Sequence, residues 1–200
     1  MGAAYNAGKR PGSEPMHPEP VIRWNRPAQV LHWLIALLIV GMGVLGLGMT
    51  QMDPSMAKLK VYALHKSIGI TVLALVALRL LWRIAHRAPP PVPMPRWQQR
   101  AAVAMHALLY VMMFVLPLSG WIYNSAANFP LQWFGTISLP SLWHFDPALK
   151  HRAHAIHESG FWILLVLVLA HAAAALKHHF IDRDQTLRRM LPGLPARKGG

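Results

Sequence analysis

The sequence is organised as four long apolar blocks that alternate with shorter polar or proline-rich stretches. A helix needs about 20 apolar residues to cross the hydrocarbon core of a bilayer, and each block reaches that length. The blocks therefore predict four membrane-spanning helices. These cover about residues 28–49, 60–83, 101–125 and 153–179.

The segments outside these blocks indicate how the chain is divided. Residues 1–22 are polar and lack the apolar run of a cleavable signal peptide, so we expect a mobile tail there. The prolines of the "APPPVPMPR" stretch fix φ and remove backbone donors, which predicts a stiff connector. The third loop, about residues 126–152, is rich in aromatic side chains that favour the membrane–water boundary, so we expect it to lie along the surface. A four-helix domain is expected at 23–193, followed by a basic tail at 194–200.

Composition agrees with a membrane protein and excludes several cofactors. Hydrophobic residues make up 54% of the chain and charged residues only 14%. Cysteine is absent, which excludes disulfides, cysteine-ligated iron–sulfur clusters and a covalently attached c-type haem. The formal net charge is +13, but the basic residues cluster at the ends of the apolar blocks without a nucleic-acid-binding motif. We therefore expect the lipid bilayer as a partner, and no nucleic acid.

The distribution of Lys and Arg predicts the orientation of the helices. Fifteen of the 20 basic residues lie in the N-terminal region, around the second loop or near the C-terminus, and five lie on the opposite side. Loops rich in Lys and Arg remain in the cytoplasm. The expected fold class is an all-α integral membrane four-helix bundle with both termini cytoplasmic.

Four of the histidines inside the predicted helices lie at two depths. His157 and His171 are fourteen residues apart on the fourth helix, which places them about 21 Å apart and within about 40° of the same face. His32 matches the cytoplasmic depth of His171, and His65 matches the outer depth of His157. An imidazole at membrane depth usually marks a functional site.

Each pair could supply two axial imidazoles to one iron, and four-helix proteins build cofactor sites in the bundle interior. The pairs His32–His171 and His65–His157 therefore predict two stacked, non-covalent haem b groups. A metal transporter could also use intramembrane histidines, but it would be expected to add carboxylates, and Glu158 is the only acidic residue within the four blocks. This makes the transporter the weaker interpretation.

Three further residues each follow a histidine by fourteen positions, so each lies on the same face of its helix as that histidine. Gly46 and Gly120 fall at the outer haem level, where a missing side chain would let a porphyrin approach the backbone. For each of them, close helix packing is an equally good explanation. Arg79 falls at the inner haem level and could pair with a propionate, or it could act as a positive-inside anchor.

The four blocks also resemble a known family. The segments "QVLHWLIALLIVG", "ALHKSIGITVLALVALRLLWRI", "MHALLYVMMFVLPLSGW" and "HESGFWILLVLVLAHAAAALKHHFIDRDQTLRRMLPG" are similar, in this order, to the helices of the bacterial cytochrome b561 family. The similarity runs from about residue 21 to residue 193. The N-terminal tail is longer than in the family pattern.

The resemblance implies a specific activity. It suggests two bis-histidine haems b held by His32, His171, His65 and His157, in a multi-pass protein of the bacterial inner membrane. It further implies an oxidoreductase of the superoxide oxidase type, which takes electrons from superoxide and passes them to ubiquinone. The histidines that match the family's quinone site are His106 and His178.

The outer side carries a local excess of positive charge that could steer an anion such as superoxide. Five cations lie within about eight residues of His65 or His157: Lys58, Lys60, Lys66, Lys150 and Arg152. Ordinary contacts of these cations with lipid headgroups are nearly as good an explanation. Two other functions stay open: a membrane-anchoring cytochrome b subunit for a separate dehydrogenase, and a haem-free, histidine-rich transporter or scaffold. The sequence also leaves a homodimer open.

Overall fold

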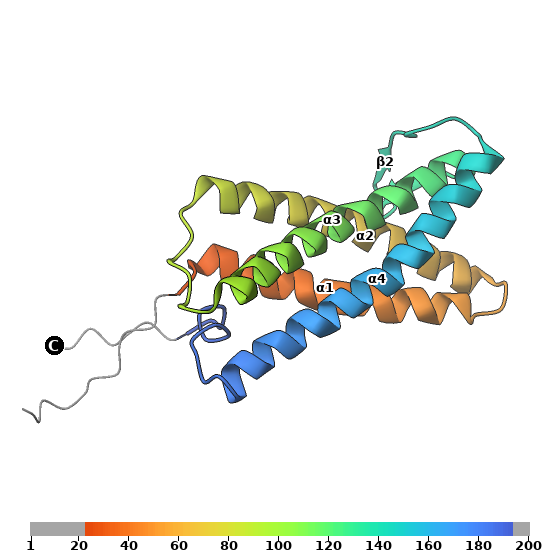
Figure 1. Ribbon diagram of the computed structural model, residues 1–200. Helices are drawn as coiled ribbons and strands as arrows, with labels where there is room; N and C mark the ends of the chain where they lie inside the picture. The colour runs from red at the N-terminus through yellow and green to blue at the C-terminus, as the bar shows by residue number, and fades with distance from the viewer. Residues whose placement is uncertain (1–22, 194–200) are drawn as a thin grey trace, which may run out of the picture.

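The computed structural model describes residues 23–193, which form four long helices and one short hairpin (Figure 1). The expected tails at 1–22 and 194–200 lie outside the described residues. The elements are α1 (Arg26–Thr50), α2 (Met56–Ala85), α3 (Arg96–Ala126), β1 (Leu131–Trp133), β2 (Ile137–Leu139) and α4 (Pro147–Phe180).

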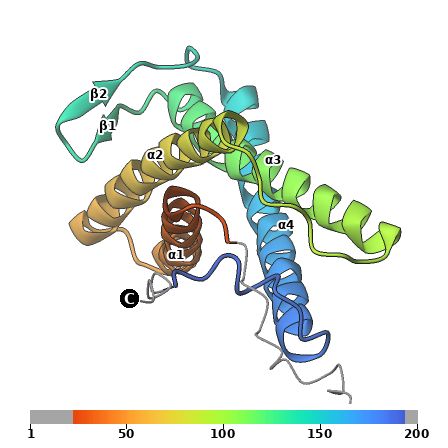
Figure 2. The same ribbon diagram turned by 90° about the vertical axis from the view of Figure 1, so that its left-hand side faces the viewer.

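The helices run alternately up and down, so the bundle has two distinct ends (Figure 1). The terminal end, seen face-on in Figure 2, contains residues 23–25, the connector 86–95 and the segment 181–193. The hairpin end contains the loop 51–55 and residues 127–146. Helix α3 packs along α4, α1 packs along α2, and α2 also contacts α3.

All four helices extend beyond the predicted apolar blocks, and three of them, α1, α2 and α4, begin at a side-chain cap. Asn25 accepts a hydrogen bond from the Ala28 N–H at 3.1 Å, and Asp146 accepts one from the Leu149 N–H at 2.9 Å. Such side-chain caps satisfy backbone donors that the helix leaves free. Helix α4 thus begins at Pro147, because a cap and not the apolar run sets its start.

The surface of the bundle is apolar over most of its length. All four helices are long and apolar enough to cross a membrane, and little of each apolar stretch is buried within the protein. Leu37, Val44 and Leu169 are at least 60% exposed, whereas the buried core between α1 and α2 is formed by Ile35, Val72 and Val76. Side chains of this kind are stable at the surface when lipid covers them. The expected all-α integral membrane bundle is confirmed.

The loop between α3 and α4 contains a hairpin that the sequence pattern did not predict. Strands β1 and β2 pair antiparallel, with Leu131 opposite Leu139. The turn covers residues 134–136, because Trp133 pairs with Ile137. Its residues Phe134 and Gly135 have φ of 47° and 69°, the left-handed conformations that tight hairpin turns use. The Phe134 N–H donates to Ser67 Oγ at 2.9 Å. This hydrogen bond fixes the hairpin to α2.

The segment after α4 returns to the start of α1. Trp33 Nε1 donates to the Met190 carbonyl at 2.9 Å, and Gln29 Nε2 donates to the Arg189 carbonyl at 3.1 Å. The Arg189 side chain in turn donates to the Pro90 carbonyl of the connector. These bonds join α1, the connector and residues 181–193 at the terminal end.

Candidate haem and quinone sites

The structure brings His65 and His157 together near the hairpin end. Their ring centroids are 6.1 Å apart, and the ring planes are inclined by 73°. The Nδ1 of His157 lies 2.8 Å from the Leu116 carbonyl and 3.2 Å from Ser119 Oγ. When Nδ1 carries the proton and donates to the carbonyl, Nε2 keeps a free lone pair for a metal. Ser119 and the Leu116 carbonyl therefore fix the orientation of the His157 ring.

Two glycines lie directly against this pair. A Cβ added at Gly120 would lie 3.1 Å from His157 Cε1, and one added at Gly46 would lie 3.4 Å from His65 Cε1. Both glycines thus lie beside the outer histidine pair, which is the level that the sequence predicted for them. A Cβ added at Gly43 would instead lie 3.4 Å from the Phe161 ring, so this glycine contacts a packing side chain and not a histidine. The missing side chains at 46 and 120 keep space open around the imidazoles.

The second pair lies nearer the terminal end and has a third histidine beside it. The ring centroids of His32 and His171 are 6.2 Å apart, with an interplanar angle of 78°. The ring of His106 lies 5.4 Å from that of His171. Arg79 Nη1 donates to the Ala28 carbonyl at 2.6 Å, so its guanidinium crosses from α2 to α1 at this level.

The spacing of both pairs fits a shared iron. Because an imidazole nitrogen binds a metal at about 2 Å, two rings on opposite sides of one ion have their centres about 6 Å apart. The separations of 6.1 and 6.2 Å match this value. His65 Nδ1 is also buried without a hydrogen-bond partner, a costly arrangement that a bound group would relieve.

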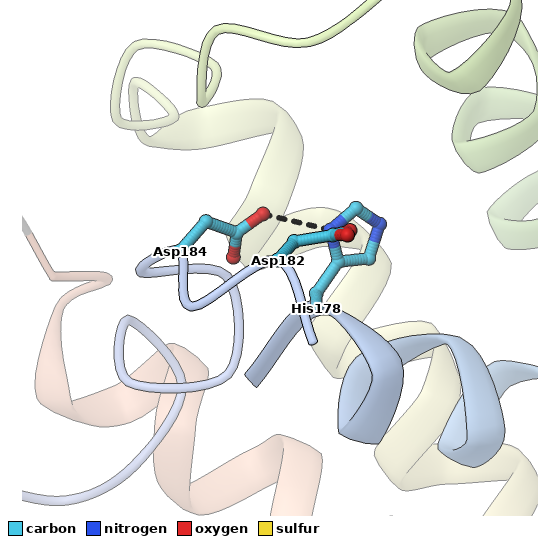
Figure 3. A group of neighbouring side chains, drawn as sticks. All are labelled: His178, Asp182 and Asp184. Carbon is cyan, nitrogen blue, oxygen red and sulfur yellow. Dashed lines mark hydrogen bonds and ion pairs between the residues drawn. The ribbon is translucent and has the colours of Figure 1, made fainter. Parts of the chain in front are cut away.

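The two residues matched to a quinone site have different surroundings. His106 lies against His171 in the bundle. His178 lies at the end of α4, where its Nδ1 is 2.7 Å from Asp184 Oδ2 and 3.0 Å from Asp182 Oδ2 (Figure 3). The sequence did not single out these two carboxylates. Their only signal was their position in "IDRDQT", within six residues of His178.

All five candidate steering cations lie at the hairpin end, but not all of them are free to meet an anion. The Lys58 ammonium donates to the Met52 carbonyl at 2.6 Å. The Lys66 ammonium donates to Asn124 Oδ1 at 3.1 Å and to the Pro130 carbonyl at 3.3 Å. Both therefore have structural contacts that join loops to α2.

The other three cations face outward. Lys60 and Arg152 are exposed. Lys150 lines an open cavity of about 310 Å³ together with Tyr123, His151 and His154. These three side chains carry the positive charge that is most accessible to a dissolved anion.

The sequence of the whole described region matches one family. A family model for prokaryotic cytochrome b561 matches residues 23–193. The chain belongs to the prokaryotic cytochrome b561 family.

Three relatives support this assignment. Cytochrome b561 homolog 2 of Escherichia coli (strain K12) is 37% identical over 173 residues, which cover 84% of this chain and 91% of the relative. Cytochrome b561 homolog 1 of the same organism is 34% identical, with coverage of 85% and 97%. A protein of Yersinia pestis named "Probable superoxide oxidase CybB" is 28% identical, with coverage of 81% and 92%.

Family membership establishes the general role of the chain. Cytochromes b561 are membrane-embedded electron-transfer proteins of the oxidoreductase type that bind haem b. The chain is accordingly a multi-pass electron-transfer protein of the lipid bilayer.

Proposed function

We propose that this cytochrome b561 transfers single electrons from superoxide on the outer side of the bacterial inner membrane to ubiquinone near the cytoplasmic side, through two haems b. The observation that supports this most strongly is the presence of two imidazole pairs, at 6.1 and 6.2 Å, at opposite levels of one bundle. In this proposal the terminal end faces the cytoplasm, and the clustering of basic residues at that end supports this orientation.

In this proposal His65 and His157 hold the outer haem, and His32 and His171 hold the inner one. A haem held by two imidazoles would supply single-electron transfer without binding oxygen. Ser119 and the Leu116 carbonyl fix the ring of His157. Arg79 lies close to His32 and His171, where its positive charge suits an inner propionate.

The superoxide step is supported by the relative from Yersinia pestis and by the exposed cations at the hairpin end. Stopped-flow mixing of the purified, haem-loaded protein with superoxide tests it, with haem absorbance as the measurement. Rapid haem reduction, followed by reoxidation when ubiquinone is added, is expected. A chain that serves only as the anchor of a separate dehydrogenase would show neither reaction without that partner.

The rate of reduction by superoxide is expected to fall as salt is added. The Debye length shrinks from about 30 Å at 0.01 M to about 10 Å at 0.1 M, which weakens steering by Lys60, Lys150 and Arg152. Replacing these three with glutamine should lower the rate and flatten its salt dependence while both haems stay bound. A rate that responds to neither change would favour a protein or an uncharged molecule as the donor.

Gly120→Ala is expected to weaken binding of the outer haem. The added methyl would lie 3.1 Å from His157 Cε1 and 3.2 Å from Nδ1, so the ring must move away from its ligand position. Disturbing the groups that orient a metal ligand typically costs about 10- to 100-fold in affinity, and titration of haem into the haem-free protein measures the change.

Gly48→Ala is the matched control, because a Cβ at Gly48 meets nothing within 4 Å. It should bind haem like the unmodified protein. Equal haem affinity in the two variants would show that Gly120 does not shape the outer site.

A further inference from the structure

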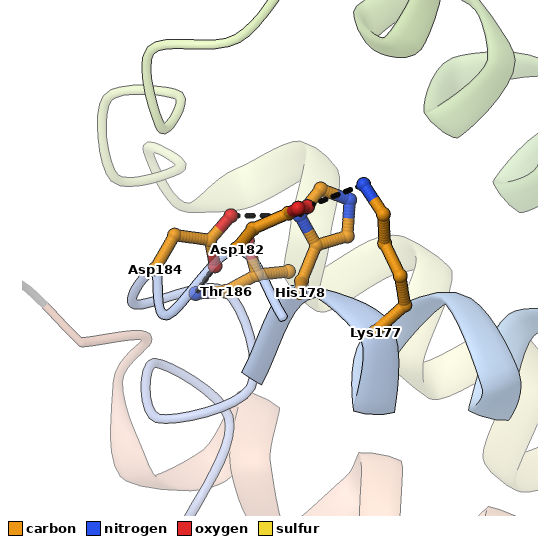
Figure 4. Close-up of polar contacts among 5 residues, drawn as sticks. All are labelled: Lys177, His178, Asp182, Asp184 and Thr186. Atoms are coloured by element: carbon orange, nitrogen blue, oxygen red, sulfur yellow. Dashed lines mark hydrogen bonds and ion pairs between the residues drawn. The ribbon is translucent and has the colours of Figure 1, made fainter. Parts of the chain in front are cut away.

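The end of α4 places two carboxylates on one side of the His178 ring. His178 Nδ1 forms a hydrogen bond with Asp184 Oδ2 at 2.7 Å, and Asp182 Oδ2 lies 3.0 Å from the same nitrogen (Figure 4). Nε2 lies on the far side of the ring from both carboxylates (Figure 3). Only 16% of the His178 side chain is exposed.

The backbone after α4 is folded so that Asp184 reaches back to this ring. Arg183 adopts a left-handed conformation with φ of 54°, and the Asp184 N–H donates to the His178 carbonyl at 3.0 Å. The other carboxylate oxygen, Asp184 Oδ1, accepts the Thr186 N–H at 2.8 Å. Each oxygen of Asp184 therefore has its own donor, and the carboxylate is held in one orientation.

The charge state of Asp184 follows from these contacts. Burial acts to raise the pKa of Asp184, but the hydrogen bonds from Thr186 and His178 outweigh it and keep the pKa below its ordinary value. Asp184 therefore holds its negative charge more firmly than an ordinary aspartate does.

The second carboxylate has a different partner. Lys177 Nζ lies 2.6 Å from Asp182 Oδ2 and neutralises it. Asp184 is thus the carboxylate near His178 that has no lysine partner among the described residues.

We propose that Asp184 is the positioning residue for His178 in proton delivery to the quinone. It accepts the Nδ1 hydrogen, so that Nε2 is the nitrogen that takes up and releases a proton. This inference rests on the proposed quinone reduction. The family resemblance pointed to His178, whereas the role of Asp184 comes from the geometry.

The proton balance defines what His178 must do. Conversion of one ubiquinone to ubiquinol takes up two electrons, which arrive one at a time from superoxide through the haems, and two protons. Nε2 of His178 accepts a proton from cytoplasmic water and donates it to a carbonyl oxygen of the quinone, and a second such cycle supplies the second proton. While both nitrogens are protonated, the positive imidazolium lies beside the Asp184 carboxylate, which stabilises it.

Asp184→Asn removes the negative charge beside His178 but keeps the hydrogen bond with the Thr186 N–H. Asparagine keeps Oδ1 for the Thr186 N–H, but its amide nitrogen replaces Oδ2 and cannot accept the Nδ1 hydrogen. We expect kcat for quinone reduction to fall at least about tenfold, since a positioned acid–base group contributes about 10²- to 10⁴-fold. KM for quinone and haem content should change little. Asp184→Glu, which restores a carboxylate, should recover part of the rate, and Asp182→Asn should cost less than Asp184→Asn.

A second measurement does not depend on activity. Nitrogen NMR of the reduced protein labelled with ¹⁵N-histidine reports which ring nitrogen carries hydrogen, and His178→Gln identifies the signal of His178. Neutral His178 should carry hydrogen on Nδ1 in the unmodified protein and on Nε2 in Asp184→Asn. An Nε2–H tautomer in the unmodified protein, or equal kcat values for Asp184→Asn and Asp182→Asn, would overturn the proposal.

These measurements separate the inference from the function on which it rests. If the unmodified protein fails to reduce quinone, the proposed acceptor is wrong, and the NMR result still decides whether Asp184 sets the tautomer of His178. If the unmodified protein reduces quinone and Asp184→Asn does so at the same rate, only the role of Asp184 is wrong.

Discussion

Replacing His171 with alanine is expected to leave the protein with about one haem b per chain instead of two. The ring of His171 lies 6.2 Å from that of His32 and 5.4 Å from that of His106, so its loss removes the centre of the inner site. Low-spin haem held by two imidazoles requires both ligands. Quantifying haem b in the purified variant checks this expectation.

His157→Ala is the matched substitution on the same helix and should also leave about one haem. The remaining haem should differ between the two variants in midpoint potential and spectrum, because His157→Ala removes a ligand of the outer pair. His32→Ala should resemble His171→Ala. If His32→Ala instead matched His157→Ala in both properties, the pairing of histidines across the helices would be wrong.

Transfer of electrons across the membrane is expected to stop in both single-haem variants, for different reasons. In His171→Ala the outer pair remains, so superoxide should still reduce the protein, but the electron would have to cross a further span of about 21 Å of helix. Ubiquinone reduction should fall to the background rate. In His157→Ala, reduction by superoxide itself should be lost.

Measurements in proteoliposomes distinguish these outcomes, with superoxide generated outside and ubiquinone in the bilayer. The Gly48→Ala variant serves as a control with both sites intact. Undiminished quinone reduction by His171→Ala would show that electrons do not pass through the inner pair.

Helical geometry explains why the histidine pairs were predictable from the sequence. A separation of fourteen residues fixes both the depth and the face of His157 and His171, and membrane-spanning helices restrict which residues share a level. The structure accordingly pairs His32 with His171 and His65 with His157. Whether these pairs bind haem iron stays a prediction.

Other features depend on contacts between distant segments and could not be predicted in this way. The hairpin is held by a hydrogen bond from Phe134 to Ser67, two residues 67 positions apart. Lys66 counts as a free cation in the sequence, yet its ammonium is bonded to Asn124 and Pro130. Asp184 reaches His178 only because the chain reverses direction after α4.

The most direct test of the central claim, that two bis-histidine haems lie in one bundle, is the haem content and carbon monoxide response of the purified protein. The account predicts about two haem b per chain, a low-spin spectrum and no spectral change when carbon monoxide is added to the reduced protein, because both axial positions of each iron are filled. One haem per chain, or a large change with carbon monoxide, would contradict it.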